Sequence, residues 1–338
     1  MRVTIKDVAR ECGFSVTTVS LVLNNKECRV SEAAKAKILG TAARMNYRPN
    51  HLAVGLVTKK THTVGVIVPD ISNFHFAEMS KAIEQECRAN GYIVLLGSYG
   101  DSDEQAAEYF SEFIGKGVEG IIFAKPLVKN PSVKELQCYE SAQAAKVPVV
   151  TFEPAGPKIK SQVVTFDYRE GGYMATKHLL DYGHRRIGYI SGGSSMLSSI
   201  AREEGYKLAL KEAGVEYDPE LLFEGDFGLE SGIRALPYLL GKNASAIFAF
   251  NDMMALGVYK AARSYNLTIP SDFSIVGFDD SFMNEILEIP LTSIVHPAID
   301  LGRESARQVL RLIRGEPVNK AVVFRPSLKV RGSTRRLF

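Results

Sequence analysis

Residues 4–23, TIKDVARECGFSVTTVSLVL, predict two short helices joined by a tight turn. Thr4 is a good N-cap for the first helix, and Asp7 follows three residues later, as a capping box requires. Gly13 suits the turn because glycine enters the left-handed backbone region without steric cost, and Ser15 can cap the second helix. The first helix carries an apolar stripe at i, i+3, i+4 and i+7, namely Ile5, Val8, Ala9 and Cys12.

The second helix has an inner and an outer side. Val19, Val22 and Leu23 can face the first helix. The residues left pointing outward are Val16, Thr17, Thr18, Ser20 and Leu21. A short, weakly charged second helix after a glycine turn is typical of a helix-turn-helix motif, whose second helix lies in the DNA major groove. The alternative is a helical hairpin that only packs against another part of the chain.

The N-terminal segment carries a charge that the rest of the chain does not share. Residues 1–60 hold 11 Lys and Arg against 4 Asp and Glu, a net charge of +7, whereas the whole chain has +3 and the remainder therefore −4. A small basic segment on a mildly acidic body favours a polyanionic partner for that segment, although a solvated surface can carry the same charge.

The composition is that of an ordinary globular protein. Of the 338 residues, 46% are hydrophobic and 23% are charged, which allows two or three domains with sizeable cores. No apolar run reaches the ~18 residues of a membrane span, and no signal segment precedes the first helical pattern. The four cysteines, Cys12, Cys28, Cys87 and Cys138, lack CxxC spacing, which favours reduced thiols. We expect a cytoplasmic protein without a membrane partner.

From Thr63 onward, apolar strands alternate regularly with amphipathic helices, and the series runs twice. This alternation predicts two similar α/β subdomains, each a parallel sheet with helices on both faces. A third helix, capped by Ser31, completes an N-terminal all-α head. The predicted boundaries are a head at 1–48, a hinge and linker at 49–61, a first subdomain at 62–161 and 291–320, and a second subdomain at 162–290 and 321–338.

The side chains that follow the predicted strands indicate a ligand site, because ligands of open parallel sheets lie beyond the carboxyl ends of the strands. Carboxylates, amides and an arginine hydrogen-bond hydroxyls, and an aromatic ring covers the apolar face of a sugar or base. The candidates are Asp70, Ser72, Asn73, Phe76, Glu153, Ser198, Ser199, Arg202, Asn251, Asp252, Asp279 and Asp280. The alternative is that these residues cap helices, Asn251 and Asp279 above all.

Several motifs follow one another along the whole chain: TIKDVARECGFSVTTVSLVLNN at 4–25, NYRPN at 46–50, GLVTKKTHTVGVIVPDISN at 55–73, REEGYKLAL at 202–210, AIFAFNDMMALGV at 246–258 and SIVGFDDS at 274–281. In this order they resemble the LacI/GalR (lactose-repressor) family of bacterial transcription regulators. The resemblance implies a helix-turn-helix head and a periplasmic-binding-protein-like body of two parallel-sheet, Rossmann-like subdomains. It also implies a repressor of carbohydrate metabolism that binds a double-stranded DNA operator under the control of a small, sugar-like effector.

The resemblance also implies roles for individual residues. Arg202, Asn251 and Asp279 match effector contacts, and Phe76 matches a pocket-lining residue. The hinge at 50–57 would form a helix on DNA, with Asn50 as a cap and Leu56 wedged into the minor groove. A flexible tether is the alternative for this segment.

The head divides its expected DNA contacts between phosphates and bases. Phosphate contacts, which fix the register, are expected from Thr4, Ser15, Thr18, Ser20 and Asn24 together with nearby Lys and Arg. Base contacts are expected from Val16, Thr17 and Leu21. Leu21 and Val54 depart from the family pattern, in which many relatives carry Arg. Leucine cannot make the bidentate contact of Arg with guanine, and we expect it to contact a thymine methyl instead.

Enzymatic function is disfavoured. The sequence has no GxGxxG after a strand, no P-loop and no HExxH motif, and the run beginning at Ser191 lacks GxSxG. The histidines are scattered without ligand spacing, so no metal site is expected; they are His51, His62, His75, His178, His184 and His296. We expect no cofactor, only a small-molecule effector such as a sugar or sugar phosphate.

The chain has no leucine-heptad tail, which favours a homodimer. Two alternatives to the main interpretation remain. One is a catabolite-control regulator that uses a phosphoprotein corepressor in place of the small effector. The other, from a different class, is a solute-binding protein, which would have a signal peptide and no basic head.

Overall fold

The computed structural model describes residues 3–24, 27–48, 60–100, 102–125, 132–152, 161–194, 196–319 and 321–337. The chain divides into two compact units, Met1–Thr61 and His62–Phe338, which we call the head and the body and describe separately. Within the described ranges, every helix is too short or too polar to span a bilayer.

In the described residues of the head, three helices have ends that follow the sequence signals. They are α1 (Ile5–Cys12), α2 (Val16–Leu23) and α3 (Glu32–Arg44). The Thr4 backbone N–H donates to Asp7 Oδ2 at 3.0 Å, and the Asp7 N–H donates to Thr4 Oγ1 at 3.4 Å, so the predicted capping box is present. Gly13 ends α1 at φ 78°, and Ser15 Oγ accepts the Thr18 N–H at 3.1 Å. The local signals therefore specify where the turn lies.

The three helices share one small apolar core. Val8, Val19 and Ile38, one from each helix, are completely buried. Leu23 packs at the edge of the same cluster, so the inner side predicted for α2 is confirmed. A core of this size buries little surface, and we expect the head to be only marginally stable alone.

The body consists of two lobes. The first lobe is built on a parallel sheet with the strand order β11-β5-β4-β3-β1-β2. Its elements are β1 (Thr63–Val68), α5 (Phe74–Ala89), β2 (Ile93–Ser98), α6 (Asp103–Gly115), β3 (Gly120–Phe123), α7 (Val133–Ala144), β4 (Val149–Thr151), β5 (Gln162–Phe166), α13 (Ala298–Arg314) and β11 (Ala321–Phe324).

The second lobe has the strand order β12-β10-β9-β8-β6-β7, and among its described strands only β12 runs antiparallel to its neighbour. Its elements are α8 (Tyr168–Asp181), β6 (Ile187–Ser191), α9 (Leu197–Glu212), the 3₁₀ turn η1 (Pro219–Leu221), β7 (Leu222–Glu224), α10 (Leu229–Gly241), β8 (Ala246–Ala249), α11 (Asp252–Ser264), β9 (Ser274–Asp279), α12 (Met283–Ile286), β10 (Thr292–Val295) and β12 (Ser327–Lys329).

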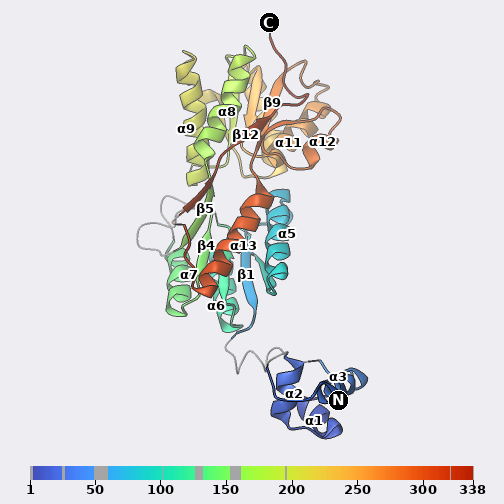
Figure 1. Ribbon diagram of the computed structural model, residues 1–338. Helices are drawn as coiled ribbons and strands as arrows, with labels where there is room; N and C mark the ends of the chain where they lie inside the picture. The colour runs from blue at the N-terminus through green and yellow to red at the C-terminus, as the bar shows by residue number, and fades with distance from the viewer. Residues whose placement is uncertain are drawn as a thin grey trace. The chain divides into compact units, whose positions relative to one another are not determined.

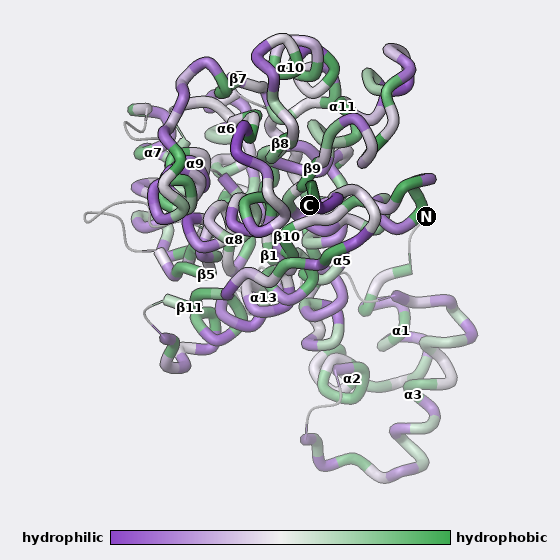
Figure 2. The backbone as a smooth tube through the Cα atoms, turned by 90° about the horizontal axis from the view of Figure 1, so that it is seen from above, coloured by the Kyte–Doolittle hydropathy of each residue, from purple (hydrophilic) through white to green (hydrophobic). Residues whose placement is uncertain are grey.

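Both sheets are covered by helices on both faces. In the first lobe α5 and α13 pack on one face and α6 and α7 on the other, whereas α8 and α9 oppose α10 and α11 in the second (Figure 1). Val66 and Ile67, neighbours in β1, belong to the two different cores because successive strand side chains point to opposite faces. In Figure 2 central strands such as β8 and β9 are mainly green, while the helices alternate between green and purple. The predicted fold class, an all-α head and a body of two parallel-sheet subdomains, is confirmed.

The predicted change-over points between the subdomains are wrong in three places. Residues 162–166 form β5, which pairs with β4, so the first sheet continues past 161. Residues 292–295 form β10, which pairs with β9 in the second sheet, and not the start of the first subdomain's return segment. Residues 321–324 form β11, which pairs with β5 in the first sheet. An apolar strand looks the same whichever sheet it joins, so its sequence does not indicate its partner.

Candidate functional site

A cavity of about 680 Å³ lies between the two lobes, at the carboxyl ends of the strands. Residues from both lobes line it: Pro69, Asp70, Ser72, Asn73, His75, Phe76, Met79, Ser98, Tyr99, Gly100, Asp103, Ala124, Lys125 and Phe152, and then Tyr168, Met196, Ser198, Arg202, Asp226, Phe227, Gly228, Phe250, Asn251, Met253, Asp279 and His296. We call this cavity the cleft.

Most of the residues that the sequence assigned to a ligand site meet in the cleft. Those that line it are Asp70, Ser72, Asn73, Phe76, Ser198, Arg202, Asn251 and Asp279. Glu153 lies outside the described residues. Three further candidates have structural contacts and do not line the cleft: Ser199 Oγ accepts the Gly192 N–H, Asp252 is buried beneath the cleft, and Asp280 pairs with Arg331 at 2.6 Å.

Arg202 is held in place by close packing of α8 against α9. A Cβ added at Gly205 would lie 2.0 Å from the backbone oxygen of Arg169, and one at Gly172 would lie 2.2 Å from that of Arg202, so both positions require glycine. The Arg202 guanidinium lies 3.6 Å from the centre of the Phe278 ring and donates to the Phe250 carbonyl. The arginine is buried, and its orientation is fixed by aromatic stacking and a backbone acceptor.

Asn251 and Asn73 cap helices as well as lining the cleft. Asn251 Oδ1 accepts the Met254 N–H at 2.8 Å at the start of α11, while its amide donates to the Phe227 carbonyl at 3.0 Å. Asn73 Oδ1 accepts the His75 N–H at 3.0 Å at the start of α5. The capping alternative is therefore correct for Asn251, but Asp279, which ends a strand, has its side chain beside His296 instead.

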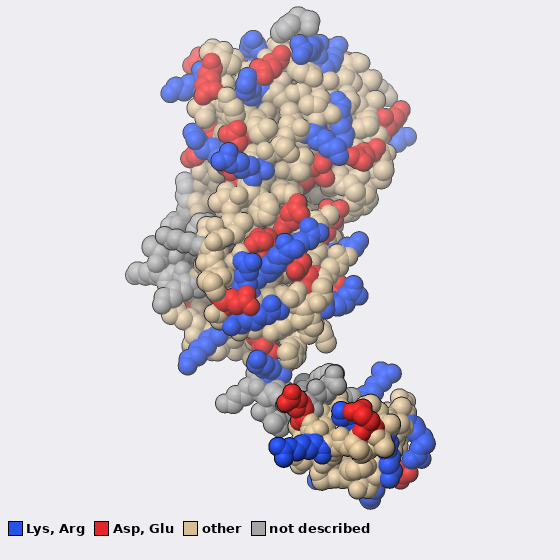
Figure 3. Space-filling view, in the orientation of Figure 1, with Lys and Arg blue, Asp and Glu red and all other residues tan. Residues whose placement is uncertain are grey.

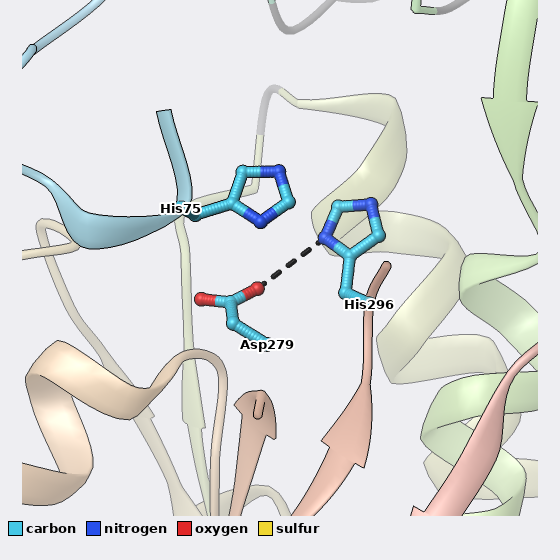
Figure 4. A group of neighbouring side chains, drawn as sticks. All are labelled: His75, Asp279 and His296. Carbon is cyan, nitrogen blue, oxygen red and sulfur yellow. Dashed lines mark hydrogen bonds and ion pairs between the residues drawn. The ribbon is translucent and has the colours of Figure 1, made fainter. Parts of the chain in front are cut away.

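Asp279 meets two histidines at the base of the cleft. Asp279 Oδ1 lies 3.3 Å from His296 Nδ1, and the His75 and His296 rings stack with their centres 4.2 Å apart (Figure 4). Burial lowers the pKa of His75 to about 3 and holds that of His296 well below 6.5, so both imidazoles are neutral at neutral pH. Burial raises the pKa of Asp279, although His75 and Arg202 oppose this shift. Asp279 also adopts φ 113°, a strained conformation of the kind that clusters at functional sites.

Asp252 anchors the loop that follows β9. Its carboxylate accepts hydrogen bonds from the Ser281 N–H, the Asn284 amide and the Ser293 hydroxyl, each at 2.8 Å. Burial raises its pKa, and the nearby charge of Asp279 adds to this effect. Asp252 therefore supports the position of Asp279 from below the cleft.

A second charged cluster lines the cleft from the first lobe. Lys125 pairs with Asp103 and, at 2.9 Å, with the buried Glu135. Burial lowers the pKa of Lys125, but its hydrogen bonds to the two carboxylates outweigh burial and the pKa is raised. Lys125 is thus a charged donor whose ammonium group already forms ion pairs with Asp103 and Glu135.

The rule that ligand-binding residues follow the carboxyl ends of parallel strands missed several residues of the cleft. Tyr168 follows β5 and His296 follows β10, and the sequence pattern predicts the wrong sheet for both strands. Lys125 comes two residues after β3, and the same rule could have found it. Distance along the sequence does not separate the histidines in space. His75 and His296 are 221 positions apart, and their rings stack.

The outer side of α2 presents the residues expected to contact DNA. Val16, at 41% exposure, and Thr17 are exposed, whereas Leu21 is half-buried. The polar candidates also serve as caps: Ser15 Oγ bonds to Thr18, and the Asn24 amide donates to the Ser20 carbonyl at 2.8 Å. Asn50, Val54 and Leu56 lie outside the described residues. Lys and Arg side chains appear on several sides of the head in the face drawn in Figure 3.

The head and the body each match a known protein family. Residues 4–50 match the family described as bacterial regulatory proteins, lacI family, and residues 176–334 match the periplasmic binding protein-like domain. The HTH-type transcriptional regulator DegA of Bacillus subtilis (strain 168) is 37% identical over 339 residues, which cover 100% of this chain and 99% of DegA.

Solved structures agree with these matches. The Lac repressor dimer bound to operator and the anti-inducer ONPF has a TM-score of 0.87 and 27% identity, over 99% of this chain and 100% of that chain. The complex of the transcriptional regulator CelR with cellobiose has a TM-score of 0.72 and 30% identity, over 98% of this chain and 100% of that chain. The similarity therefore extends over the head and the body together.

Proposed function

Because this chain belongs to the lacI family of bacterial regulatory proteins, it is a DNA-binding transcription regulator and not an enzyme, and we propose that it binds its operator as a homodimer under the control of a small, polyhydroxylated effector. The observation that carries the proposal is that one chain joins a helix-turn-helix head to a two-lobed body with a polar, aromatic-lined cleft. The proposed location is the cytoplasm, where the operator is.

The proposed contacts with DNA are supported by the arrangement of α2. Val16 and Thr17 are the exposed side chains at its start and would contact bases in the major groove, with Leu21 beside them. Phosphate contacts would come from the polar groups at the ends of the helices, namely Thr4, Ser15, Thr18, Ser20 and Asn24. The expected hinge contacts of Asn50 and Leu56 remain part of the proposal.

The homodimer is supported by apolar side chains at one edge of the body. β2 is one of the two edge strands of the first sheet, and its Ile93 and Leu96 are 67% and 46% exposed. These two side chains are three residues apart and so point to opposite faces of the strand, and exposed apolar groups at a sheet edge fit burial in a protein–protein interface. The Lac repressor neighbour is a dimer, and two heads on a two-fold axis would match two operator half-sites.

The effector class is supported by the side chains of the cleft. Arg202, Asn251 and Asp279 would hydrogen-bond ligand hydroxyls, and Phe76 would cover an apolar face. Ser198, Ser72, Asn73 and Asp70 would complete the polar lining, as the Glu153 side chain is also expected to do. CelR, a structural neighbour, is in complex with cellobiose. A phosphoprotein corepressor remains the alternative controlling partner.

Two measurements test this proposal. Purified full-length protein, used to select genomic DNA fragments, should enrich one pseudo-palindromic sequence; if it enriches none, the proposal is wrong. Binding to that fragment is then titrated with sugars, sugar phosphates and a phosphorylated carrier protein, and one of the small molecules should change the affinity. A response to the carrier protein alone would favour the corepressor alternative.

The Arg202→Ala variant separates the two functions of the chain. DNA binding without the effector should stay within about twofold of the wild type, whereas the effector response should disappear because the guanidinium fork is lost. Arg263→Ala, which removes an exposed arginine from α11 of the same lobe, is the matched control and should respond normally. A normal response in Arg202→Ala would remove this residue from the effector site.

A further inference from the structure

Three potential metal ligands converge at the base of the cleft. His75 lies on α5 of the first lobe, Asp279 ends β9 of the second lobe, and His296 follows β10 at the start of the chain's return to the first lobe. One ligand atom from each residue lies within 4.8 Å of the other two, and Figure 4 shows the carboxylate below the pair of rings. Three distant segments of the chain therefore bring two imidazoles and a carboxylate to one point.

The two imidazoles are buried side chains of a kind that binds metal ions. Both residues are more than nine-tenths buried, and an imidazole offers a ring nitrogen as a metal ligand. Within the described part of the chain, His75 Nδ1 has no hydrogen-bond partner although it is buried. An unpaired buried acceptor is costly, and a ligand or ion at this point would satisfy it.

The buried charges around this point favour a cation. Asp252 contributes a buried carboxylate, Asp279 contributes one whose side chain is 13% exposed, and Arg202 contributes one buried guanidinium. The two carboxylates outnumber the single guanidinium, and the three hydrogen bonds to Asp252 come from uncharged donors. A bound divalent cation would supply the missing positive charge.

We propose that His75, Asp279 and His296 form a site for a divalent first-row transition metal ion, such as Zn²⁺. Two imidazoles and one carboxylate are a ligand set that Zn²⁺ uses when it keeps a further position open, and here that position would face the cleft. Because the lone pair of an imidazole lies in the ring plane, one of the two stacked rings must turn about its Cβ–Cγ bond to share the ion. Asp279 already lies beside both rings and needs no comparable rotation.

Metal binding at this point would link the two lobes. His75 belongs to the first lobe, whereas Asp279 belongs to the second, so an ion held by both stabilises one arrangement of the lobes over others. This property does not depend on which effector or operator the protein uses. Metal binding can therefore be tested without knowledge of either.

The test titrates untagged, metal-free, full-length protein with Zn²⁺ and with Co²⁺, using calorimetry and the visible absorption of bound Co²⁺. We expect one ion per chain with a dissociation constant below about 100 μM, and no comparable binding of Mg²⁺, which prefers oxygen ligands. Zn²⁺ should also raise the melting temperature of the body. Binding weaker than about 100 μM, or more than one equivalent site, overturns the proposal.

Variants locate the ion. His75→Gln and His296→Gln should each weaken binding at least about tenfold and remove the Co²⁺ absorption, and Asp279→Asn should weaken binding as well. His62→Asn is the control, because His62 is exposed and its φ of 50° suits asparagine. Each variant is first shown to melt cooperatively. Wild-type affinity in folded His75→Gln and His296→Gln would place the ion elsewhere and overturn the assignment.

Discussion

The two lobes of the body share one architecture but bury different kinds of side chain. Beneath the cleft, the second lobe buries a network in which Asp252 accepts three hydrogen bonds, and the same lobe buries Arg202, His178 and His184. In the first lobe, buried charge is concentrated in the pairing of Lys125 with Glu135, and the two cores are mainly apolar. The lobes thus differ in chemistry more than in shape.

This difference indicates which lobe holds the polar side chains of the cleft in fixed orientations. Buried hydrogen bonds fix the direction of a polar side chain, because every alternative orientation leaves a donor or acceptor unpaired. The second lobe therefore holds Arg202, Asn251 and Asp279 in defined positions. The first lobe contributes Phe76, the capping residue Asn73 and one charged donor, Lys125, whose ammonium group already pairs with two acids. We infer that directional recognition depends mainly on the second lobe.

The largest expected effect concerns the helix pairs that support each lobe. A Cβ at Gly205 would lie 2.0 Å from the Arg169 oxygen, and a Cβ at Gly302 in the first lobe would lie 2.5 Å from the Met79 oxygen. Both clashes are with backbone, so Gly205→Ala should reduce the free energy of unfolding by about 3 kcal/mol and Gly302→Ala by somewhat less. Chemical denaturation measures both values.

The control for these variants is Gly241→Ala, at the end of α10. No atom lies within 4 Å of a Cβ at this position, so the substitution should be neutral or stabilise by up to about 1 kcal/mol. If Gly205→Ala were as stable as Gly241→Ala, the close contact of α8 with α9 would not determine the position of Arg202.

The sequence predicted the helices, the strands and part of the cleft, but not which strands are neighbours. The 3.6-residue and two-residue periodicities predicted the helices and strands, and the rule for parallel strand ends predicted Arg202 and Asp279 as cleft residues. Periodicity does not report which strand is the neighbour, so β5 and β10 were assigned to the wrong sheets. That error also concealed His296, which follows β10.

Buried polar partners were harder still to predict from the sequence. Lys125 and Glu135, or His75 and His296, meet only because separate elements converge in the fold. Nothing in the local pattern around each residue specifies its partner. The N-terminal caps, in contrast, depend on neighbours three residues away, and the Thr4 cap was predicted correctly from the sequence.

A second prediction uses pH to sharpen the contrast between the lobes. His178 is buried in the second lobe, 2.9 Å from Thr334 Oγ1, and burial lowers its pKa to about 4. The unfolded chain therefore binds this proton more readily than the folded chain does. The contribution of His178 to the free energy of unfolding is complete above about pH 6.5 and is lost as the pH falls towards 4. Between pH 7 and pH 5 this group should cost the protein about 2 kcal/mol.

The measurement compares the pH dependence of unfolding in the wild type and in His178→Gln. The glutamine variant should show a shallower decline on acidification, by about the same 2 kcal/mol, whatever its stability at pH 7. His62→Asn, which changes an exposed histidine, should retain the wild-type decline. Equal slopes in all three proteins would show that burial of His178 does not contribute to the acid sensitivity.

The smallest expected effect compares two asparagine caps, one from each lobe. Asn73→Ala removes the acceptor for the His75 N–H from a half-buried residue, and a lost cap costs about 1 kcal/mol. Asn251→Ala removes a cap from a buried residue and also leaves the carbonyl of the half-buried Phe227 without its 3.0 Å partner, so its cost should be about 2 kcal/mol. The expected difference of about 1 kcal/mol is measured by denaturation of both variants under one condition. Equal costs would mean that the second hydrogen bond of Asn251 adds no stability beyond ordinary helix capping. The inference that directional recognition depends mainly on the second lobe would then rest on Arg202 and Asp279 alone.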